Sequence, residues 1–183
     1  SEYTGSKYSV ACSSGTSALH ISLLVSDIKR DDYVILPNIT FIASANSIKY
    51  VGANPIFIDV DLNNWQMDIL LLNEFLEKKT YQKNNKCFLK KDNKCIKAIM
   101  PVHVLGNIVD IDKLLEIGNN HNIQIIEDSS ESLGSFYKSK HSGTFGKIGV
   151  FSFNGNKIIT TGGGGMIITD DDEIAKEAKH LTT

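Results

Sequence analysis

The chain has 183 residues, of which 42% are hydrophobic and 8% aromatic, so it can bury the core of one sizeable domain. Nineteen basic residues oppose 21 acidic ones, and the net charge of −2 gives no electrostatic basis for binding nucleic acid or an anionic membrane. Without an apolar run of about 18 residues, a signal-like start or cysteines at metal-binding spacing, we expect a cytoplasmic protein with reduced thiols.

Strands and helices are predicted to alternate along the chain. Short apolar runs bounded by turn residues predict strands at 8–12, 33–37, 55–60, 96–104, 124–128, 148–153 and 165–169. Helical spacing of apolar residues predicts helices at 17–29, 41–50, 68–79, 110–120 and 172–181. This alternation is typical of an α/β domain with a mainly parallel seven-stranded sheet and helices on both faces, and we expect residues 1–183 to form one such domain.

The lysine-rich segment 80–94 interrupts this pattern. Polar stretches flank Cys87-Phe88-Leu89, which predicts an excursion on the surface, such as a small hairpin. A nucleic-acid patch is the alternative, but the aromatic residues are not interleaved with the lysines as stacking platforms would be.

Polar and small residues gather where the predicted parallel strands end, which is the edge at which such sheets bind ligands. These residues are Ser14-Gly15-Thr16, Thr40-Phe41, His103, Asp128 and the loop from Ser152 to Lys157. The turn at Ser14–Thr16 opens a helix and can direct backbone N–H groups at an anion, although Ser and Thr also serve as ordinary helix caps.

Lys157 stands between two apolar strands and is followed by four glycines at 162–165. A buried amine is costly unless it is paired, neutral or covalently used, so we interpret Lys157 as a candidate Schiff-base lysine. The glycines indicate either room for a ligand or backbone that packs closely behind the lysine loop. We favour close packing, within the sheet or against a dimer partner.

Asp128 ends a buried strand and has two interpretations. It can cap the turn that follows, or it can pair with a cation such as a pyridinium nitrogen, which a carboxylate keeps protonated. With Ser14, Gly15, Thr16 and Ser152 as phosphate ligands, the set fits a site for pyridoxal 5′-phosphate (PLP). Phe41 can lie on the ring face of such a cofactor or simply belong to the core.

Five ordered motifs carry a resemblance to a known family. They are SGTSALH, TFIASAN, HVLGN, EDSSESLG and SFNGNKIITTG, and together they span nearly the whole chain. In this order they resemble the DegT/DnrJ/EryC1/StrS sugar aminotransferases, which are PLP enzymes of fold type I. The resemblance implies the three-layer large domain of these aminotransferases, with Lys157 as the Schiff-base lysine and Asp128 as the partner of the pyridine nitrogen.

The same resemblance implies further cofactor contacts and a branch of the family. Gly15, Thr16 and Ser152 match phosphate ligands, and Phe41 matches a residue near the ring. Glu131 stands where many members have His or Gln, Gly163 where many have Glu, and Asn154-Gly155 where His-Pro or Phe-Pro is commoner. These variants resemble the branch that makes amino sugars of the legionaminic or bacillosamine type.

By this resemblance the protein moves an amino group from glutamate to a keto nucleotide sugar for surface polysaccharide or another glycan. A 4-keto-6-deoxy UDP- or GDP-sugar is favoured, with a 3-keto sugar as the alternative. Family members are homodimers with shared sites and are about twice as long, so we expect an N-terminal segment and a C-terminal small domain outside this chain. The first alternative is a PLP-dependent sugar dehydratase of the same fold. That branch has histidine at the lysine position, so the presence of Lys157 counts against it. A non-catalytic nucleotide-binding module would need a Gly-x-Gly-x-x-Gly after the first strand, which is absent.

Overall fold

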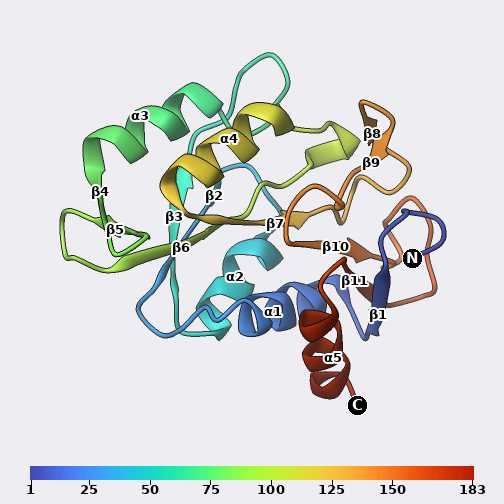
Figure 1. Cartoon of the computed structure of the whole chain (residues 1–183). Helices are drawn as coiled ribbons and strands as arrows, with labels where there is room; N and C mark the ends of the chain where they lie inside the picture. Colours follow the sequence, from blue (N-terminus) through green and yellow to red (C-terminus); the bar gives the residue numbers. More distant parts are fainter.

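The computed structural model describes all 183 residues and has one large β-sheet between two groups of helices (Figure 1). Across the sheet the strands follow the order β1-β11-β10-β7-β6-β2-β3. Their bounds are β1 Tyr8–Cys12, β2 Tyr33–Pro37, β3 Asn54–Ile58, β6 Cys95–Ile99, β7 Gln124–Asp128, β10 Ile148–Ser152 and β11 Gly165–Thr169. The pairs from β10 to β3 are parallel, and β11 is antiparallel to both of its neighbours, so the predicted mainly parallel α/β sheet is confirmed.

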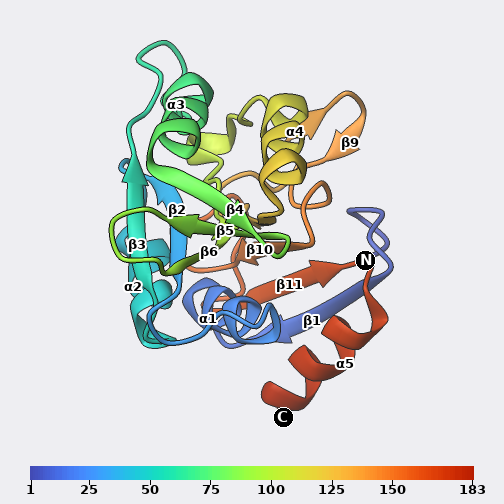
Figure 2. The ribbon, with the colours of Figure 1, turned by 60° about the vertical axis from the view of Figure 1, so that its left-hand side comes forward.

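Both faces of this sheet are covered by helices. On one face lie α1 (Gly15–Val25), α2 (Ile42–Tyr50) and α5 (Asp172–Leu181); on the other lie α3 (Ile69–Lys79) and α4 (Ile111–His121), as Figures 1 and 2 show. Two clusters of 19 and 15 buried apolar residues fill the two spaces between sheet and helices. The central strands are therefore buried on both sides, which explains why β2 and β10 are almost entirely apolar.

Most helices begin at a residue whose side chain accepts backbone N–H groups. Ser14, Asp68, Asp110 and Asp171 cap α1, α3, α4 and α5 in this way. Such a cap stabilises a helix by about 1 kcal/mol. The first helix ends at Val25 rather than near Lys29, because Asp27 adopts a left-handed backbone (φ 58°) that an α-helix cannot continue through.

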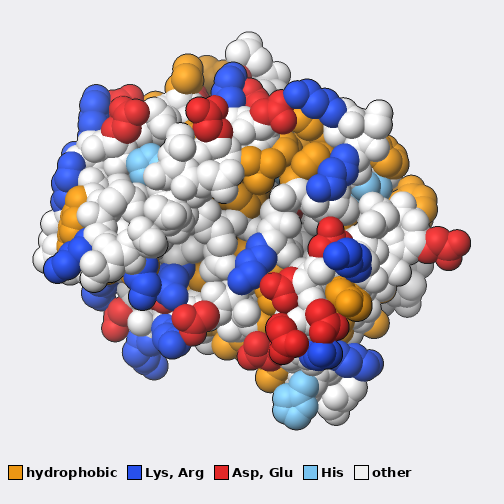
Figure 3. Space-filling view, in the orientation of Figure 1, with side chains coloured by type: hydrophobic (Ala, Val, Ile, Leu, Met, Phe, Trp, Pro, Cys, Tyr) orange, Lys and Arg blue, Asp and Glu red, His pale blue; other side chains and the backbone are white.

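Segment 80–94 is a hairpin, as predicted, but it also joins the main sheet. Strands β4 (Thr80–Lys83) and β5 (Lys86–Leu89) flank Asn84-Asn85, whose positive φ angles of 51° and 55° suit a tight hairpin turn. Strand β5 pairs antiparallel with the start of β6, so the hairpin is more than a surface excursion. Basic and acidic side chains are interspersed on the face shown in Figure 3, with no extended field of one sign.

Two local predictions differ from the structure after β6. The strand predicted at 96–104 ends at Ile99, and a short 3₁₀ turn, η1 (Val104–Gly106), follows, in which Leu105 has a left-handed, non-helical backbone. The loop after β7 holds an unpredicted hairpin, β8 (Phe136–Tyr137) and β9 (Lys140–His141). Its turn residues Lys138 and Ser139 both have positive φ, and neither is the Gly or Asn that usually signals such a turn.

None of the helices is long and apolar enough to cross a membrane. Cys12, Cys87 and Cys95 are free thiols. Burial raises the pKa of the Cys12 thiol to about 11, so this cysteine is a poor nucleophile at neutral pH.

Candidate active site

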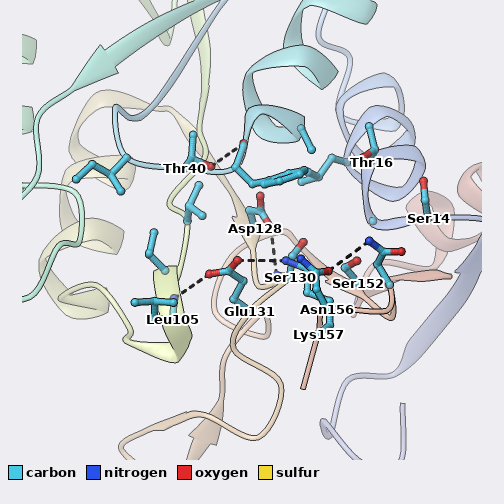
Figure 4. Close-up of a pocket in the computed structure, with 18 of the residues that line it drawn as sticks. Ser14, Thr16, Thr40, Leu105, Asp128, Ser130, Glu131, Ser152, Asn156 and Lys157 are labelled. Atoms are coloured by element: carbon cyan, nitrogen blue, oxygen red, sulfur yellow. Dashed lines mark hydrogen bonds and ion pairs between the residues drawn. The ribbon is translucent and has the colours of Figure 1, made fainter. Parts of the chain in front are cut away.

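A cavity of about 490 Å³ opens at the carboxyl ends of the parallel strands (Figure 4). This volume lies within the usual range for small-molecule sites. The eight residues expected to bind the cofactor or to carry the chemistry all line it: Ser14, Gly15, Thr16, Phe41, Asp128, Glu131, Ser152 and Lys157. We call this cavity the lysine cavity. Its eight predicted residues come from four separate loops, which the parallel topology brings to one edge of the sheet.

Lys157 lies in the tight loop after β10, where its backbone N–H donates to the carbonyl of Asn154 at 3.0 Å. Its side chain is only 11% exposed, and its Nζ lies 3.2 Å from a carboxylate oxygen of Glu131. The same Nζ lies 5.8 Å from the ring centroid of Phe41, within the range of a cation–π contact. The amine thus has an anionic partner in a largely enclosed place, and this pairing offsets the free-energy cost of burying the amine.

Glu131 joins the lysine loop to the turn η1. One of its oxygens faces Lys157, and the other accepts the backbone N–H of Leu105 at 2.9 Å, as Figure 4 shows. Partial burial raises the pKa of this carboxyl, but the Leu105 N–H and the Lys157 amine outweigh it and hold the pKa below its ordinary value. Glu131 is therefore a carboxylate at neutral pH, placed where it can hold or release the amine of Lys157.

Asp128 ends β7 and is 4% exposed. The hydroxyl of Ser44 donates to one carboxylate oxygen at 2.7 Å, and the backbone N–H of Ser130 donates to the other at 3.1 Å. Asp128 thus caps the following turn, as the simpler interpretation states. It also lines the cavity, so its carboxylate is available to a positively charged group there.

The start of α1 forms another wall of the cavity. The hydroxyl of Ser14 caps the helix by accepting the N–H of Ser17 at 3.0 Å. The N–H groups of Gly15 and Thr16 belong to the first turn, where a helix offers no internal acceptor, so they can bind an anion. Hence the capping and the anion-binding interpretations of this turn are compatible.

Close backbone packing holds this helix start against β10 and β11. A Cβ on Gly15 would lie 2.7 Å from the Cβ of Ser152, so only glycine lets the Ser152 hydroxyl approach the helix start. A Cβ on Gly165 would lie 2.3 Å from the carbonyl oxygen of Ser14. Close packing within the chain therefore accounts for Gly165, the last of the four glycines, whereas a Cβ on Gly162 would meet nothing.

Two sequence interpretations need correction at this edge. His103 is fully buried and does not reach the cavity; its Nε2 pairs with Glu127 at 3.0 Å instead. Phe41 is 66% exposed, so the interpretation of Phe41 as a core residue is wrong. The ring lies at the cavity wall beside the lysine amine.

Several residues of the site were not predicted from the sequence. Ser44 lies outside the cavity lining but holds Asp128; it is in the first turn of α2, and its only signal is a small polar residue on the buried side of a helix. Trp65 and Leu105 also line the cavity, and both adopt positive φ, which no sequence pattern here predicts.

Comparison with known proteins gives a consistent result. The model of the DegT/DnrJ/EryC1/StrS aminotransferase family matches residues 1–183. The chain is 42% identical over 160 residues to GDP-perosamine synthase of Caulobacter vibrioides, covering 87% of this chain and 39% of that protein. It is 39% identical over 160 residues to a putative pyridoxal phosphate-dependent aminotransferase of Bacillus subtilis, again covering 87% of this chain and 39% of that protein.

Among solved structures, a DegT/DnrJ/EryC1/StrS aminotransferase from Brucella abortus superposes with a TM-score of 0.89 at 30% identity, covering 98% of this chain and 46% of that one. The fold predicted for the large domain of these aminotransferases is thus confirmed. The chain spans about two fifths of the length of the curated relatives it matches.

Proposed function

Since the chain belongs to the DegT/DnrJ/EryC1/StrS aminotransferase family, we propose that it is part of a PLP-dependent enzyme that transfers an amino group from glutamate to a keto nucleotide sugar. One observation carries the proposal: a nearly buried lysine, a buried carboxylate and the first turn of a helix, whose N–H groups have no acceptor within the helix, line the same cavity. Each of these occurs alone in many proteins, but together they match the three charged or reactive parts of PLP.

The residues of the lysine cavity fit this cofactor. The phosphate would bind the N–H groups of Gly15 and Thr16 with the hydroxyl of Ser152, where a helix start favours negative charge. Asp128 would pair with the pyridine nitrogen, and Phe41 would lie near the ring. When bound, PLP supplies an aldehyde that takes up an amine and a ring that withdraws electrons from the attached carbon.

The chain's own residues then have distinct roles. Lys157 would hold the cofactor and, once its amine is free, move a proton within the site, a task for which an amine in an enclosed cavity is suited. Glu131 would accept the amine of Lys157 when that amine is released, as it does in the ion pair here. Asp128, kept in place by Ser44, would maintain the positive charge of the ring nitrogen.

The substrate proposed is a 4-keto-6-deoxy sugar linked to GDP or UDP. The similarity to a GDP-perosamine synthase supports an amino sugar carried by a nucleotide. The variants Glu131, Gly163 and Asn154-Gly155 support a sugar of the legionaminic or bacillosamine type as the alternative to perosamine. We also propose a homodimer with shared sites, and further segments of chain that complete the enzyme.

A sugar dehydratase on this fold is the second candidate. Histidine at the lysine position is the feature of that branch, and Lys157 counts against it. The two candidates differ in product: a transaminase adds nitrogen to the sugar, whereas a dehydratase removes an oxygen from it.

The test is an incubation of the protein with PLP, ¹⁵N-glutamate and a panel of keto nucleotide sugars, with the products followed by mass spectrometry. We expect ¹⁵N in one nucleotide sugar and none with a Lys157→Ala variant. A product that lacks nitrogen and has lost oxygen would favour the dehydratase. Absence of any new product from the whole panel would oppose both candidates.

A further inference from the structure

A second, smaller cavity of about 250 Å³ adjoins the lysine cavity. It is lined by Asn63, Asn64, Trp65, Val104, Leu105 and Asn107, and Trp65, Val104 and Leu105 also line the lysine cavity. We call it the tryptophan cavity. None of the residues assigned to the cofactor lines it, so it lies beside the reacting centre and shares a wall with it.

The two large apolar side chains of this shared wall are held in an unfavourable backbone conformation. Ten non-glycine residues have positive φ, and eight of them are Asp, Asn, Ser or Lys. The other two are Trp65 (φ 63°) and Leu105 (φ 55°). A bulky residue with positive φ is a genuine outlier, and such outliers gather at ligand sites. That both apolar outliers meet at one cavity indicates a function for their placement.

This placement is also well supported by hydrogen bonds. The N–H of Trp65 donates to the carbonyl of Asp61 at 2.8 Å, and the buried Gln66 reaches from the same turn to the carbonyl of Val104 at 3.3 Å. The Leu105 N–H is held by Glu131, the partner of Lys157. Nevertheless Trp65 is 54% exposed and Leu105 is 74% exposed, so the turns are fixed while the side chains stay open to solvent.

The side chains that line the tryptophan cavity limit the class of ligand that it can bind. The six residues include no charged side chain, so the cavity has nothing to hold a diphosphate. It offers one indole face, two aliphatic side chains and three carboxamides. The side chain of Asn107 makes no hydrogen bond within the chain, and Asn64 uses only its carbonyl oxygen, for the N–H of Gln66. An aromatic face with free carboxamides suits a flat, uncharged ring with donors and acceptors at its edge.

We propose that the tryptophan cavity binds the nucleobase of the nucleotide-sugar substrate, with Trp65 as the stacking platform and Leu105 as the wall that separates the base from the reacting sugar. This inference rests on the proposed function for the identity of the substrate. It assigns to Trp65 and Leu105 a role in substrate binding and none in the chemical step.

Because Trp65 is the single tryptophan of the chain, its fluorescence reports on the tryptophan cavity and on the wall that this cavity shares with the lysine cavity. We expect UDP or GDP, added without PLP or sugar, to change the tryptophan emission in a saturable way. A hexose 1-phosphate, which has a sugar and a phosphate but no base, should not change it. An equal response to the hexose 1-phosphate would assign the cavity to the sugar and overturn the proposal.

Substitution of Trp65 by asparagine distinguishes a loss of nucleotide binding from a loss of folding stability. Trp65→Asn suits positive φ, so we expect its melting temperature, followed by circular dichroism, to be at least that of the wild type. Calorimetry should show affinity for the nucleoside diphosphate roughly tenfold weaker or worse, as loss of one stacked base predicts. The matched control is Phe57→Ala, an aromatic that is 51% exposed outside both cavities, and it should bind as the wild type does.

Unchanged affinity in Trp65→Asn, or no binding of either nucleotide to the wild-type chain, would overturn the proposal. These titrations need neither PLP nor turnover. Their failure would therefore leave the transaminase proposal standing, and failure of amino transfer would leave the base site standing.

Discussion

Replacement of Glu127 by glutamine tests how the fold holds together the edge of the sheet that carries the lysine cavity. Glu127 is fully buried beside Asp128, and four groups donate to its carboxylate. His103 Nε2 and the Gly143 N–H donate to one oxygen at 3.0 and 2.8 Å, and the N–H groups of Phe145 and Gly146 donate to the other at 2.7 and 2.6 Å. This carboxylate therefore ties β7 to the loop that leads into β10 and Lys157.

Glutamine has nearly the same shape, but its NH₂ group must face donors on one side. If it faces Phe145 and Gly146, two hydrogen bonds to a charged group are lost, at about 1.5–3 kcal/mol each. We therefore expect Glu127→Gln to lower the free energy of unfolding by about 3 kcal/mol or more, which is a large part of the ~5–15 kcal/mol typical of a domain. For a chain of this length, that corresponds to a fall in melting temperature of roughly 6–12 °C.

The effect should depend on pH. Burial opposes the charge of Glu127, but the His103 imidazole and the backbone N–H groups outweigh it and hold the pKa of this carboxyl below its ordinary value. A lowered pKa stabilises the fold above the unfolded value of about 4.3, and this stabilisation disappears as pH falls through the folded pKa. The difference between wild type and Glu127→Gln should therefore be full near pH 7 and shrink in acid.

Urea unfolding followed by circular dichroism at several pH values measures this difference. The exposed Glu177, on α5, provides the control, because Glu177→Gln should change stability by no more than about 0.5 kcal/mol. A Glu127→Gln variant as stable as the wild type at pH 7 would refute the reasoning, as would a difference that stays constant down to pH 3.

Three further substitutions address the lysine cavity directly. Gly15→Ala forces the Ser152 side chain away from the helix start, so we expect PLP affinity, measured by equilibrium dialysis, to fall about tenfold; unchanged affinity would contradict the phosphate assignment. Asp128→Ala should weaken PLP binding and lower kcat at least 100-fold, and activity within a few fold of wild type would remove its role. Glu131→Gln removes the carboxylate that pairs with the Lys157 amine at 3.2 Å, so we expect a smaller fraction of the protein to carry PLP after borohydride reduction; an unchanged fraction would count against the coupling.

The fold was largely predictable because its strands are buried on both sides. Strands at 8–12, 33–37, 124–128 and 165–169 match the structure at both ends, since each has apolar residues at its centre and is followed by polar or turn residues. Element ends were wrong where a residue with positive φ stops a regular pattern, as Asp27 does after α1. Such angles are set by local hydrogen bonds that periodicity does not reveal.

The site was predictable where residue type and topology agree. Lys157, Asp128 and the Ser14–Thr16 turn each follow a strand, and strand ends of a parallel sheet meet at one edge. Trp65 and Leu105 could not be predicted, because their place at the cavity depends on left-handed backbone that neither residue favours. His103 also follows β6, but its pairing with Glu127 turns it into the core.

The central claim is that Lys157 is the residue that carries PLP. Incubation with PLP, reduction by borohydride and mass spectrometry of the digested protein measure this directly. We predict one phosphopyridoxyl group per chain, located on Lys157, absent from Lys157→Ala and retained in Lys7→Ala, which alters an exposed lysine. Label spread over surface lysines, or retained at the same level without Lys157, would contradict the account.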